Sequence, residues 1–262
     1  MHGHQAHLWY IHPDLITSQA ARSIYGQVLS SDEVARNRRF VFPQGRHEHL
    51  LTRALVRGVL STYQPSIPPQ SWRFSVNEFG RPEVAGPVCT PRLRFNVSHT
   101  SGLIVCLVTV ERDVGIDVEN TTRATIGGPR IADHYFSPNE AGALRSLPEA
   151  AQHDRFFDYW TLKEAYIKAR GLGLQLPLGQ FSFFSTTGEC WSGYPEGESP
   201  IRISFGPEIH DNPERWQFEL RHQTPLHRLA IAIGRTPGEP DLRVMTYSGL
   251  PPLRPKTVPP AF

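Results

Sequence analysis

The spacing of apolar residues separates helices from strands along the first half of this chain. Leu51, Leu55 and Val59 recur at four-residue steps, which places them on one face of a helix within residues 50–63. Three short runs rich in apolar and β-branched residues follow, separated by turn residues: 95–98, 103–110 and 114–119. Such runs are typical of successive strands. The pattern therefore predicts a helix followed by a series of strands.

The second half shows the same succession of helices and then strands. Ser137, Pro138 and Glu140 form a helix-start signal, because the serine can cap the first turn and the glutamate can complete a capping box. A longer helix is predicted from about residue 154 to 170, where Gly171 is suited to end it. Candidate strands of a second sheet follow: 181–184, 201–205, 216–220 and 229–233. Proline and polar residues dominate from residue 236 onward, so a flexible tail is expected at 251–260.

Composition narrows the class of protein. With 262 residues, 39% of them hydrophobic and 20% charged, the chain resembles an ordinary globular protein of one large or two small domains. Its net charge of +2 does not indicate a nucleic-acid partner. The apolar stretch 103–110 is far too short to span a bilayer, and no secretory leader opens the chain. Cys89, Cys106 and Cys190 lack paired or metal-ligand spacing, which suits reduced thiols in a cytoplasm.

Basic residues crowd one short region of the chain. They are Arg36, Arg38, Arg39, Arg46, Arg53 and Arg57. The cluster could be the solvated face of a helix, or it could line a site for an anionic ligand. Charge alone does not choose between these two interpretations.

Three carboxylates and a lysine are spaced so that they could meet at one point. Asp117 and Glu119 are two residues apart in a β-branched stretch, so on a strand their side chains share a face. Trp160, Glu164 and Lys168 are four apart in a helical stretch, so they share a face of a helix. If the strand and the helix pack together, the carboxylates can hold a hard cation. Magnesium takes a few carboxylates and completes its shell with water and phosphate oxygens.

Each part of this set has an ordinary structural explanation when it stands alone. Glu164 and Lys168 could be a solvated pair one helical turn apart. Asp117 and Glu119 could be the wet face of a half-buried strand, and a single histidine such as His99 is more often structural than catalytic. Their occurrence together, in this order and flanked by apolar runs, favours a functional site that holds a metal ion against a diphosphate.

Three blocks of the sequence resemble those of the 4′-phosphopantetheinyl transferases, specifically the larger two-lobed, surfactin-synthetase-type family. The blocks are residues 79–82 (Phe-Gly-Arg-Pro), 95–99 (Phe-Asn-Val-Ser-His) leading to 115–119 (Gly-Ile-Asp-Val-Glu), and 160–168 (Trp-Thr-Leu-Lys-Glu-Ala-Tyr-Ile-Lys). The similarity runs from about residue 30 to residue 234. The combination of the second and third blocks is highly specific.

The resemblance implies an α+β fold of two similar lobes related by a pseudo-twofold axis. Each lobe is expected to be a small antiparallel sheet with helices. The lobes are expected at residues 1–112 and 113–235, with the metal site at their interface, and the Pro-rich tail at 236–262.

The activity implied by the resemblance is transfer of the 4′-phosphopantetheine arm of coenzyme A to a serine of an apo carrier protein. Adenosine 3′,5′-bisphosphate is the other product, and magnesium, or manganese in its place, is the cofactor. The implied partners are coenzyme A and acyl, peptidyl or aryl carrier domains, with no nucleic acid or membrane, and the enzyme is expected to be a cytoplasmic monomer. The alternative is a coenzyme A-binding protein of the same fold without transferase activity.

The resemblance also implies a role for each residue of the spaced set. Asp117, Glu119 and Glu164 match the family's metal ligands, and Glu119 is the least essential because not every relative has it. Glu164 is the candidate general base; since a metal-bound carboxylate is a poor base, water is the other candidate. Lys168, one turn from Glu164, is placed for the diphosphate. Asp117, Glu164 and Lys168 are therefore the expected catalytic residues.

The residues expected to bind coenzyme A are Arg36, Arg81, Asn96, Ser98, His99 and Lys168. The arginines and the histidine match positions that the family uses around the nucleotide end, chiefly the 3′-phosphate. The match is incomplete, because the family often has lysines at the positions of Glu33 and Arg36, and this chain has a basic residue only at the second. Arg46 and Arg53 are candidates to compensate.

Carrier recognition is expected to involve the segment after the metal strand. In the family this segment, here residues 121–136, faces the carrier. Its Gly-Gly-Pro sequence at 127–129 predicts a mobile loop, which could be a docking surface or only a connector.

Overall fold

The chain forms two compact units. The structure, a computed structural model, describes residues 4–122, 129–188, 191–194 and 199–252. The first unit contains the residues up to Val76, Pro82–Glu111, and the residues from Val244 onward. The second contains Asn77–Arg81 and Arg112–Arg243.

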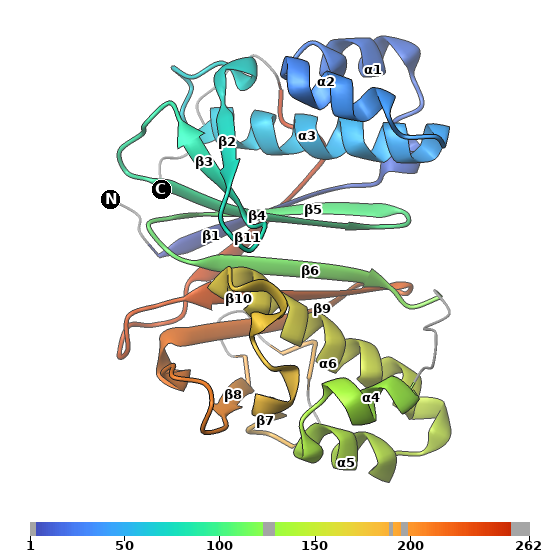
Figure 1. Ribbon diagram of the computed structural model, residues 1–262, viewed down its shortest axis with the longest axis vertical. Helices are drawn as coiled ribbons and strands as arrows, with labels where there is room; N and C mark the ends of the chain where they lie inside the picture. The colour runs from blue at the N-terminus through green and yellow to red at the C-terminus, as the bar shows by residue number, and fades with distance from the viewer. Residues whose placement is uncertain (1–3, 123–128, 189–190, 195–198, 253–262) are drawn as a thin grey trace. The chain divides into compact units, whose positions relative to one another are not determined.

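The first unit is built on a four-stranded sheet with the strand order β11-β1-β5-β4 (Figure 1). Its strands are β1 (Gln5–Ile11), β4 (Leu93–Thr100), β5 (Leu103–Val110) and β11 (Arg243–Ser248). β5 pairs antiparallel with both β1 and β4. A separate antiparallel hairpin joins β2 (Arg73–Val76) and β3 (Pro82–Gly86). The helices are α1 (Gln19–Gly26), α2 (Ser31–Arg38) and α3 (Pro43–Tyr63).

Helix α3 carries the apolar stripe predicted from the sequence. Leu51, Leu55 and Val59 are fully buried and belong to one cluster with Phe95 of β4 and Ile104 of β5. The helix begins seven residues before the predicted range of 50–63, at Pro43, where proline suits a first turn that needs no N–H partner. The helix and the sheet thus form the two packed layers of this unit.

The structure differs from the sequence expectation near the C-terminal end. Residues 236–262 are expected to be a tail, but Arg243–Ser248 forms β11 at the edge of the first sheet, beside β1. Tyr247 of β11 stacks on Trp9 of β1, with ring centroids 4.7 Å apart. A strand that pairs with the opposite end of the chain has no local signal, because long-range pairing is decided by tertiary contacts. Most of the expected flexible stretch, residues 253–260, lies outside the described residues.

A buried histidine in β1 should make stability depend on pH. His7 is 1% exposed, and burial lowers its pKa to about 4. Its Nδ1 atom lies 2.6 Å from the hydroxyl of Tyr63. Since the unfolded chain binds the proton with its ordinary pKa near 6.5, the unfolding free energy should fall as pH drops from about 6.5 towards 4, by at most about 1.4 kcal/mol per pH unit. Urea unfolding of His7→Asn should show a flatter pH dependence than wild type. The exposed His210→Asn should not, and an equal slope in the two variants would contradict the prediction.

The described part of the second unit contains a three-stranded sheet, a two-stranded ladder and three α-helices (Figure 1). The sheet has the order β6-β10-β9, and all its pairs are antiparallel. Its strands are β6 (Val114–Asn120), β9 (Trp216–Thr224) and β10 (His227–Gly234), and the ladder joins β7 (Phe181–Ser185) to β8 (Ile201–Phe205). The helices are α4 (Pro129–Tyr135), α5 (Pro138–Ser146) and α6 (Glu149–Arg170). The four strands predicted to form one second sheet are therefore divided. β9 and β10 form a sheet with β6, whereas β7 pairs only with β8.

Short 3-10 helices connect several of these elements in both units. They are Pro13–Leu15, Pro69–Ser71, Gly173–Gln175, Leu178–Gln180 and Pro213–Arg215.

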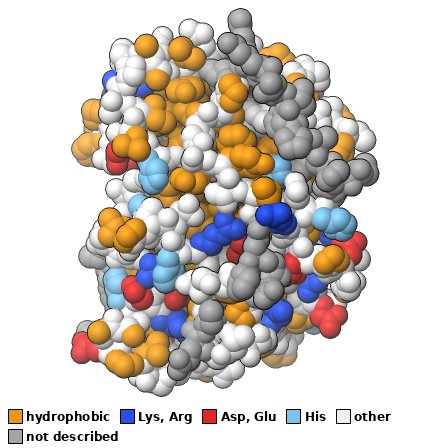
Figure 2. All heavy atoms as spheres, turned by 180° about the vertical axis from the view of Figure 1, so that it is seen from behind, with side chains coloured by type: hydrophobic (Ala, Val, Ile, Leu, Met, Phe, Trp, Pro, Cys, Tyr) orange, Lys and Arg blue, Asp and Glu red, His pale blue; other side chains and the backbone are white. Residues whose placement is uncertain are grey.

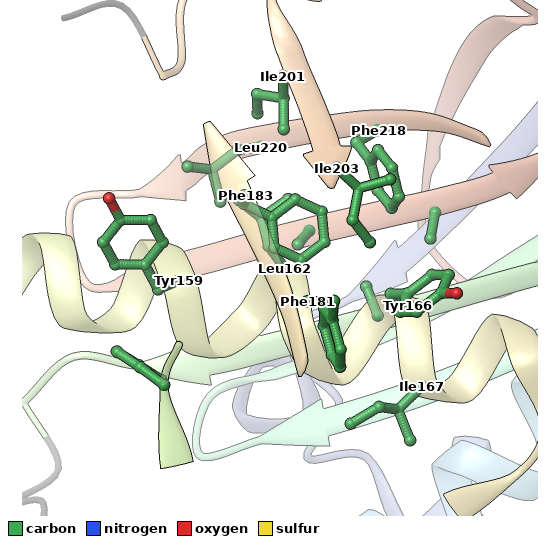
Figure 3. Packing of buried hydrophobic residues seen from close by; sticks show 14 of the residues in the cluster. Tyr159, Leu162, Tyr166, Ile167, Phe181, Phe183, Ile201, Ile203, Phe218 and Leu220 are labelled. Carbon is green, nitrogen blue, oxygen red and sulfur yellow. The ribbon is translucent and has the colours of Figure 1, made fainter. Parts of the chain in front are cut away.

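Both helix signals of the second half are present in the structure. Ser137 caps α5 and forms a complete capping box with Glu140. Helix α6 starts at Glu149, five residues before the predicted start, and ends at Gly171, whose φ is 66°. The apolar face of α6 packs on β7, β8 and β9, where Figure 3 shows Leu162 and Tyr166 among aromatic and branched side chains such as Phe181.

The lysine of the third sequence block is part of this core. Lys163 is 1% exposed and pairs with Glu140, also 1% exposed, at 2.7 Å. Its ammonium also donates to the carbonyl oxygens of Leu178 (2.8 Å) and Phe181 (2.7 Å). Burial lowers the pKa of Lys163, and the charge and hydrogen bond of Glu140 oppose this shift. The side chain thus fixes α6 to α5 and to the chain that enters β7.

The face drawn in Figure 2 has mixed charge. On the face drawn in Figure 2, acidic and basic side chains lie interspersed. No helix among the described residues is long and apolar enough to cross a membrane. Cys89 and Cys106 are free thiols, and Cys190 lies outside the described residues.

Candidate active site

Strand β6 presents two chemically different faces. Ile116 and Val118 are buried apolar residues that alternate with Asp117 and Glu119. Gly115 precedes the two acidic residues on the same face, because alternate residues of a strand share a face. This face carries the two carboxylates predicted from the sequence.

Gly115 brings α6 unusually close to this face of β6. A Cβ atom on Gly115 would lie 2.0 Å from the carbonyl oxygen of Ala165 and 2.4 Å from the backbone nitrogen of Ala169. These atoms belong to the backbone of α6, so they could not yield to a side chain without moving the helix. The glycine therefore lets the C-terminal half of α6, which carries Glu164 and Lys168, lie directly against the strand that carries Asp117.

Asp117 and Lys168 form a direct ion pair across this contact. The Nζ atom of Lys168 donates to Oδ1 of Asp117 at 2.6 Å. Asp117 is only 4% exposed, whereas the side chain of Lys168 is 29% exposed. A charge-assisted hydrogen bond of this length is strong and directional. The predicted meeting of the strand carboxylate and the helix ammonium is thus present in the structure.

The carboxylate of Glu164 lies on the same face of α6 as Lys168, one helical turn earlier, and both members of the pair affect its pKa. Burial raises the pKa, the negative charge of Asp117 raises it further, and the positive charge of Lys168 partly opposes them. A carboxylate that lies near a second negative charge is stabilised in its ionised form by a cation between them. Asp117, Glu164 and Lys168 therefore form one electrostatically coupled group, called the acidic site below.

The acidic site is smaller than the predicted three-carboxylate site. Among the residues that the structure describes, no group of three or more His, Cys, Asp or Glu side chains is arranged to hold a metal ion. Asp117 and Glu164 are coupled, and Glu119 lies further along the same face of β6. Carboxylate oxygens suit magnesium, which needs only one or two of them when phosphates complete its shell. The residues present therefore fit this ion.

Glu119 has a basic neighbour that the sequence analysis missed. It lies opposite Arg228 of β10 in the strand register. Arg228 is 4% exposed and pairs with Asp154 (2.9 Å) and Asp158 (3.3 Å) of α6. The only signal for this link was a charged residue within an otherwise apolar strand. The pairs fasten β10 to α6 beside the acidic site.

The first unit holds four of the residues expected to bind coenzyme A. Asn96 and Ser98 share one face of β4 and are 5% and 7% exposed, whereas the neighbouring His99 is exposed. Arg36 of α2 lines a hollow of about 580 Å³ together with Asp32, Ala35, Arg39 and Phe40.

A second histidine, which the sequence analysis missed, lies in the same basic surroundings. Burial lowers the pKa of His49, and the charges of Arg53 and Arg36 and the nearby His99 lower it further. Its Nδ1 atom lies 3.1 Å from the amide of Asn37. The arginines of α2 and α3 thus lower the pKa of His49, and the negative charge of Glu33 partly opposes them.

The acidic residue that departs from the family pattern, Glu33, neutralises two arginines of α3. It accepts hydrogen bonds from Arg53 and from Arg57, the latter at 2.8 Å. Burial alone would raise its pKa, but these arginines and the backbone of Ser30 outweigh burial and lower it. Arg46, the other candidate to compensate, donates to the carbonyl oxygen of Phe40 at 2.7 Å.

Arg81, also expected at the nucleotide, lies in the second unit and contacts backbone. Its Nη1 atom donates to the carbonyl oxygen of Ala169 at 2.7 Å, and its Nη2 atom to that of Val114 at 3.4 Å. The residue is 8% exposed. The structure thus brings Arg81 to the C-terminal end of α6.

With this fold and acidic site established, the similarity to known proteins is clear. Residues 113–233 match the 4′-phosphopantetheinyl transferase superfamily, and residues 17–111 match the N-terminal part of 4′-phosphopantetheinyl transferase. The chain belongs to the 4′-phosphopantetheinyl transferase family, in its two-lobed form.

Individual relatives support the same assignment. The chain is 38% identical to the 4′-phosphopantetheinyl transferase HetI of Nostoc sp. over 170 residues, which are 65% of this chain and 70% of the relative. It is 32% identical to Sfp of Bacillus subtilis over 75% of this chain and 84% of Sfp. The transferase ffp of Bacillus subtilis is 28% identical over 93% of this chain and 99% of its own length. The predicted family, the α+β fold of two lobes and the class of enzyme are confirmed.

Proposed function

We propose that Asp117, Glu164 and Lys168 are the catalytic centre for the transfer of phosphopantetheine from coenzyme A to a carrier protein. The 2.6 Å contact of Lys168 with Asp117, next to a glutamate whose pKa Asp117 raises, carries this proposal. The serine oxygen of the carrier attacks the phosphorus that bears the pantetheine arm. The bond from that phosphorus to the diphosphate bridging oxygen breaks, and adenosine 3′,5′-bisphosphate leaves. Catalysis of such a transfer consists mostly of positioning and charge neutralisation.

Asp117 and Glu164 would hold magnesium, with Glu119 as the third and weakest ligand. When bound, this ion neutralises the diphosphate and polarises the scissile bond. Lys168, which is partly exposed, would contact the diphosphate on the side of α6. The proton of the serine passes to Glu164 or to a water molecule beside it.

Glu164→Gln should separate the two roles proposed for this residue, metal ligand and general base. If Glu164 accepts the serine proton, the wild-type rate should rise with pH as the carboxyl group of Glu164 loses its own proton. We expect the variant to remain slow at every magnesium or manganese concentration and to lose this rise. The measurement is the initial rate of carrier modification against metal concentration at several pH values.

Glu119→Gln is the matched control for this experiment, because the amide oxygen can still bind the ion and the residue has no proposed role as a base. Excess metal should restore most of its rate. Complete restoration of Glu164→Gln by metal would rule out the base role and leave water as the proton acceptor.

Coenzyme A would be held through its phosphates by the basic cluster of the first unit. Arg36 and His99 are the proposed contacts for the 3′-phosphate, and the buried polar pair Asn96 and Ser98 for other oxygens of the nucleotide. The support is that Arg36 and Arg39 line one hollow of about 580 Å³, and that Asn96, Ser98 and His99 follow one another closely along β4. Arg36→Ala should therefore raise the KM for coenzyme A more than that for dephospho-coenzyme A, which lacks this phosphate.

The proposed acceptors are acyl, peptidyl and aryl carrier domains. Of the segment that would face them, residues 123–128 lie outside the described residues, Gly127-Gly128 among them. Tyr135 at the end of α4 is 47% exposed, and its ring centroid lies 6.3 Å from that of Trp160. An aromatic pair of this kind suits a docking surface, although the segment could also be a connector. Mass spectrometry of several apo carriers, incubated with coenzyme A, magnesium and this protein, tests the function directly. No mass gain on any carrier would refute it.

We further propose that the functional lobes are residues 1–112 and 113–235, followed by residues 236–262. The two family matches, which end at residue 111 and begin at residue 113, support this boundary. The last segment includes β11 of the first sheet, so truncation after residue 235 should lower the melting temperature.

A further inference from the structure

The turn Asn77–Arg81, called the cap turn below, is built as a rigid unit. Asn77 accepts hydrogen bonds at Oδ1 from the backbone nitrogens of Phe79 (3.0 Å) and Arg81 (2.9 Å). Its own backbone nitrogen donates to the carbonyl oxygen of Arg81 at 3.0 Å. Gly80 has a φ of 86°, a conformation that glycine adopts without strain. The turn therefore presents the side chains of Asn77 and Arg81 in fixed positions.

Both side chains are directed at the C-terminal end of α6. The amide nitrogen of Asn77 donates to the carbonyl oxygen of Gly171 at 2.7 Å, and Arg81 donates to that of Ala169 at 2.7 Å. The last carbonyl groups of a helix have no partner within the helix. The cap turn supplies partners for two carbonyls at this end, one on each side of the final residue of α6, Arg170.

Arg81 also connects this helix end to the strand of the acidic site. Its Nη2 atom donates to the carbonyl oxygen of Val114 of β6 at 3.4 Å. Its Nη1 atom lies 3.8 Å from the carboxylate of Asp113, just before that strand. Gly171 allows this approach, because a Cβ atom there would lie 2.8 Å from Cδ of Arg81. In α6, Lys168 directly precedes Ala169, whose carbonyl oxygen Arg81 binds. In β6, Asp117 is three residues after Val114, whose carbonyl oxygen Arg81 also binds.

We infer that Asn77 and Arg81 are positioning residues that hold Glu164 and Lys168 of α6 in register with Asp117 of β6. This inference rests on the proposed function of the acidic site. It gives Arg81 a different task from the phosphate contact expected from the sequence, because its guanidinium is buried and bound to two backbone carbonyls. Loss of either side chain would loosen the end of α6 and misplace the catalytic lysine, and a displacement of about 1 Å can cost roughly 100-fold in rate.

The test compares Arg81→Met and Asn77→Asp with wild type in the full-length protein. Asn77→Asp is a near-isosteric change that keeps the acceptor for Phe79 and Arg81. It replaces the donor to Gly171 by a carboxylate oxygen, so this contact becomes repulsive. We expect both variants to lower kcat by roughly 10-fold to 100-fold, by the same factor with coenzyme A and with dephospho-coenzyme A. Amide hydrogen exchange of the free enzyme should be faster in peptides that cover residues 165–171. Arg81→Lys, which can reach one carbonyl, should recover part of both losses.

Two further variants make the result specific. Arg145→Met removes an exposed arginine that pairs with the surface residue Asp133, and it should change neither kcat nor exchange. Arg36→Ala should change KM with coenzyme A and leave exchange of α6 as in wild type.

Several outcomes would overturn the inference. If Arg81→Met raises only the KM for coenzyme A, and the defect disappears with dephospho-coenzyme A, Arg81 is a phosphate ligand. Faster exchange with unchanged kcat would reduce the cap turn to a purely structural element. If Arg81→Met does not fold, Asn77→Asp decides. The inference is refuted if Asn77→Asp has the same amide exchange and the same kcat as wild type. Inactivity of the wild type on every carrier would instead refute the proposed function, and the exchange measurement would still decide whether the cap turn holds α6.

Discussion

Replacing Asp117 by alanine should reduce phosphopantetheine transfer to less than a tenth of the wild-type turnover, a loss of at least about 1.4 kcal/mol of transition-state stabilisation. The substitution removes one proposed metal ligand and also the partner of Lys168, whose ammonium lies 2.6 Å away. The apolar face of β6, with Ile116 and Val118, is untouched. The fold should therefore survive, and the loss should appear in kcat.

The measurement is carrier modification by mass spectrometry under saturating coenzyme A, together with circular dichroism of the purified variant. Glu208→Ala, which removes an exposed carboxylate outside both the acidic site and the carrier-facing segment, is the control and should retain full turnover. A second readout is independent of turnover: magnesium should raise the melting temperature of wild type with coenzyme A bound, and this increase should shrink in Asp117→Ala. A folded Asp117→Ala that keeps more than a tenth of the turnover would remove Asp117 from the catalytic centre.

The sequence predicted those parts of this site that depend on local spacing. Asp117 and Glu119 share a face because β6 is a strand, and Glu164 and Lys168 share a face because α6 is a helix. The capping box at Ser137 and the helix end at Gly171 are local for the same reason. The shared faces follow from the periodicity of a single element, and the two helix ends follow from the residue types at the caps.

The features that the sequence did not predict depend on pairs of residues far apart in the chain. The partner of β6 is β10, more than a hundred residues later, although β5 is its neighbour in sequence. Likewise, β11 joins β1 from the other end of the chain. The backbone contacts of Arg81 involve atoms that no side-chain pattern reveals. Tertiary packing decides such pairings, and single-sequence propensities do not encode it.

Lys163 shows the same limit within one motif. Next to Glu164 and five residues before Lys168, it reads as one more charge of a solvated or catalytic helix. The structure turns it to the opposite side of α6, where it is 1% exposed and paired with Glu140. The two lysines of the third block therefore have different roles, since Lys168 lies at the acidic site and Lys163 lies in the core.

Replacing Lys163 by methionine should accordingly destabilise the protein by roughly 3–5 kcal/mol, the usual cost of removing one partner from a buried ion pair. Methionine has a similar length, so the change leaves little cavity, and the main cost is the buried charge of Glu140. Glu140 would keep its hydrogen bonds from Ser137 (3.0 Å) and from the backbone nitrogen of Phe183 (2.9 Å), which limits the loss. The carbonyl oxygens of Leu178 and Phe181 would also lose their donor.

Urea unfolding should show this loss as a lower midpoint with an unchanged slope. The control is Arg145→Met, which breaks an exposed ion pair and should change stability by less than about 0.5 kcal/mol. The double variant Lys163→Met with Glu140→Gln removes both charges, so it should be less destabilised than the sum of the two single variants. Additive effects would contradict the assignment, because they would mean that the two buried charges do not depend on one another.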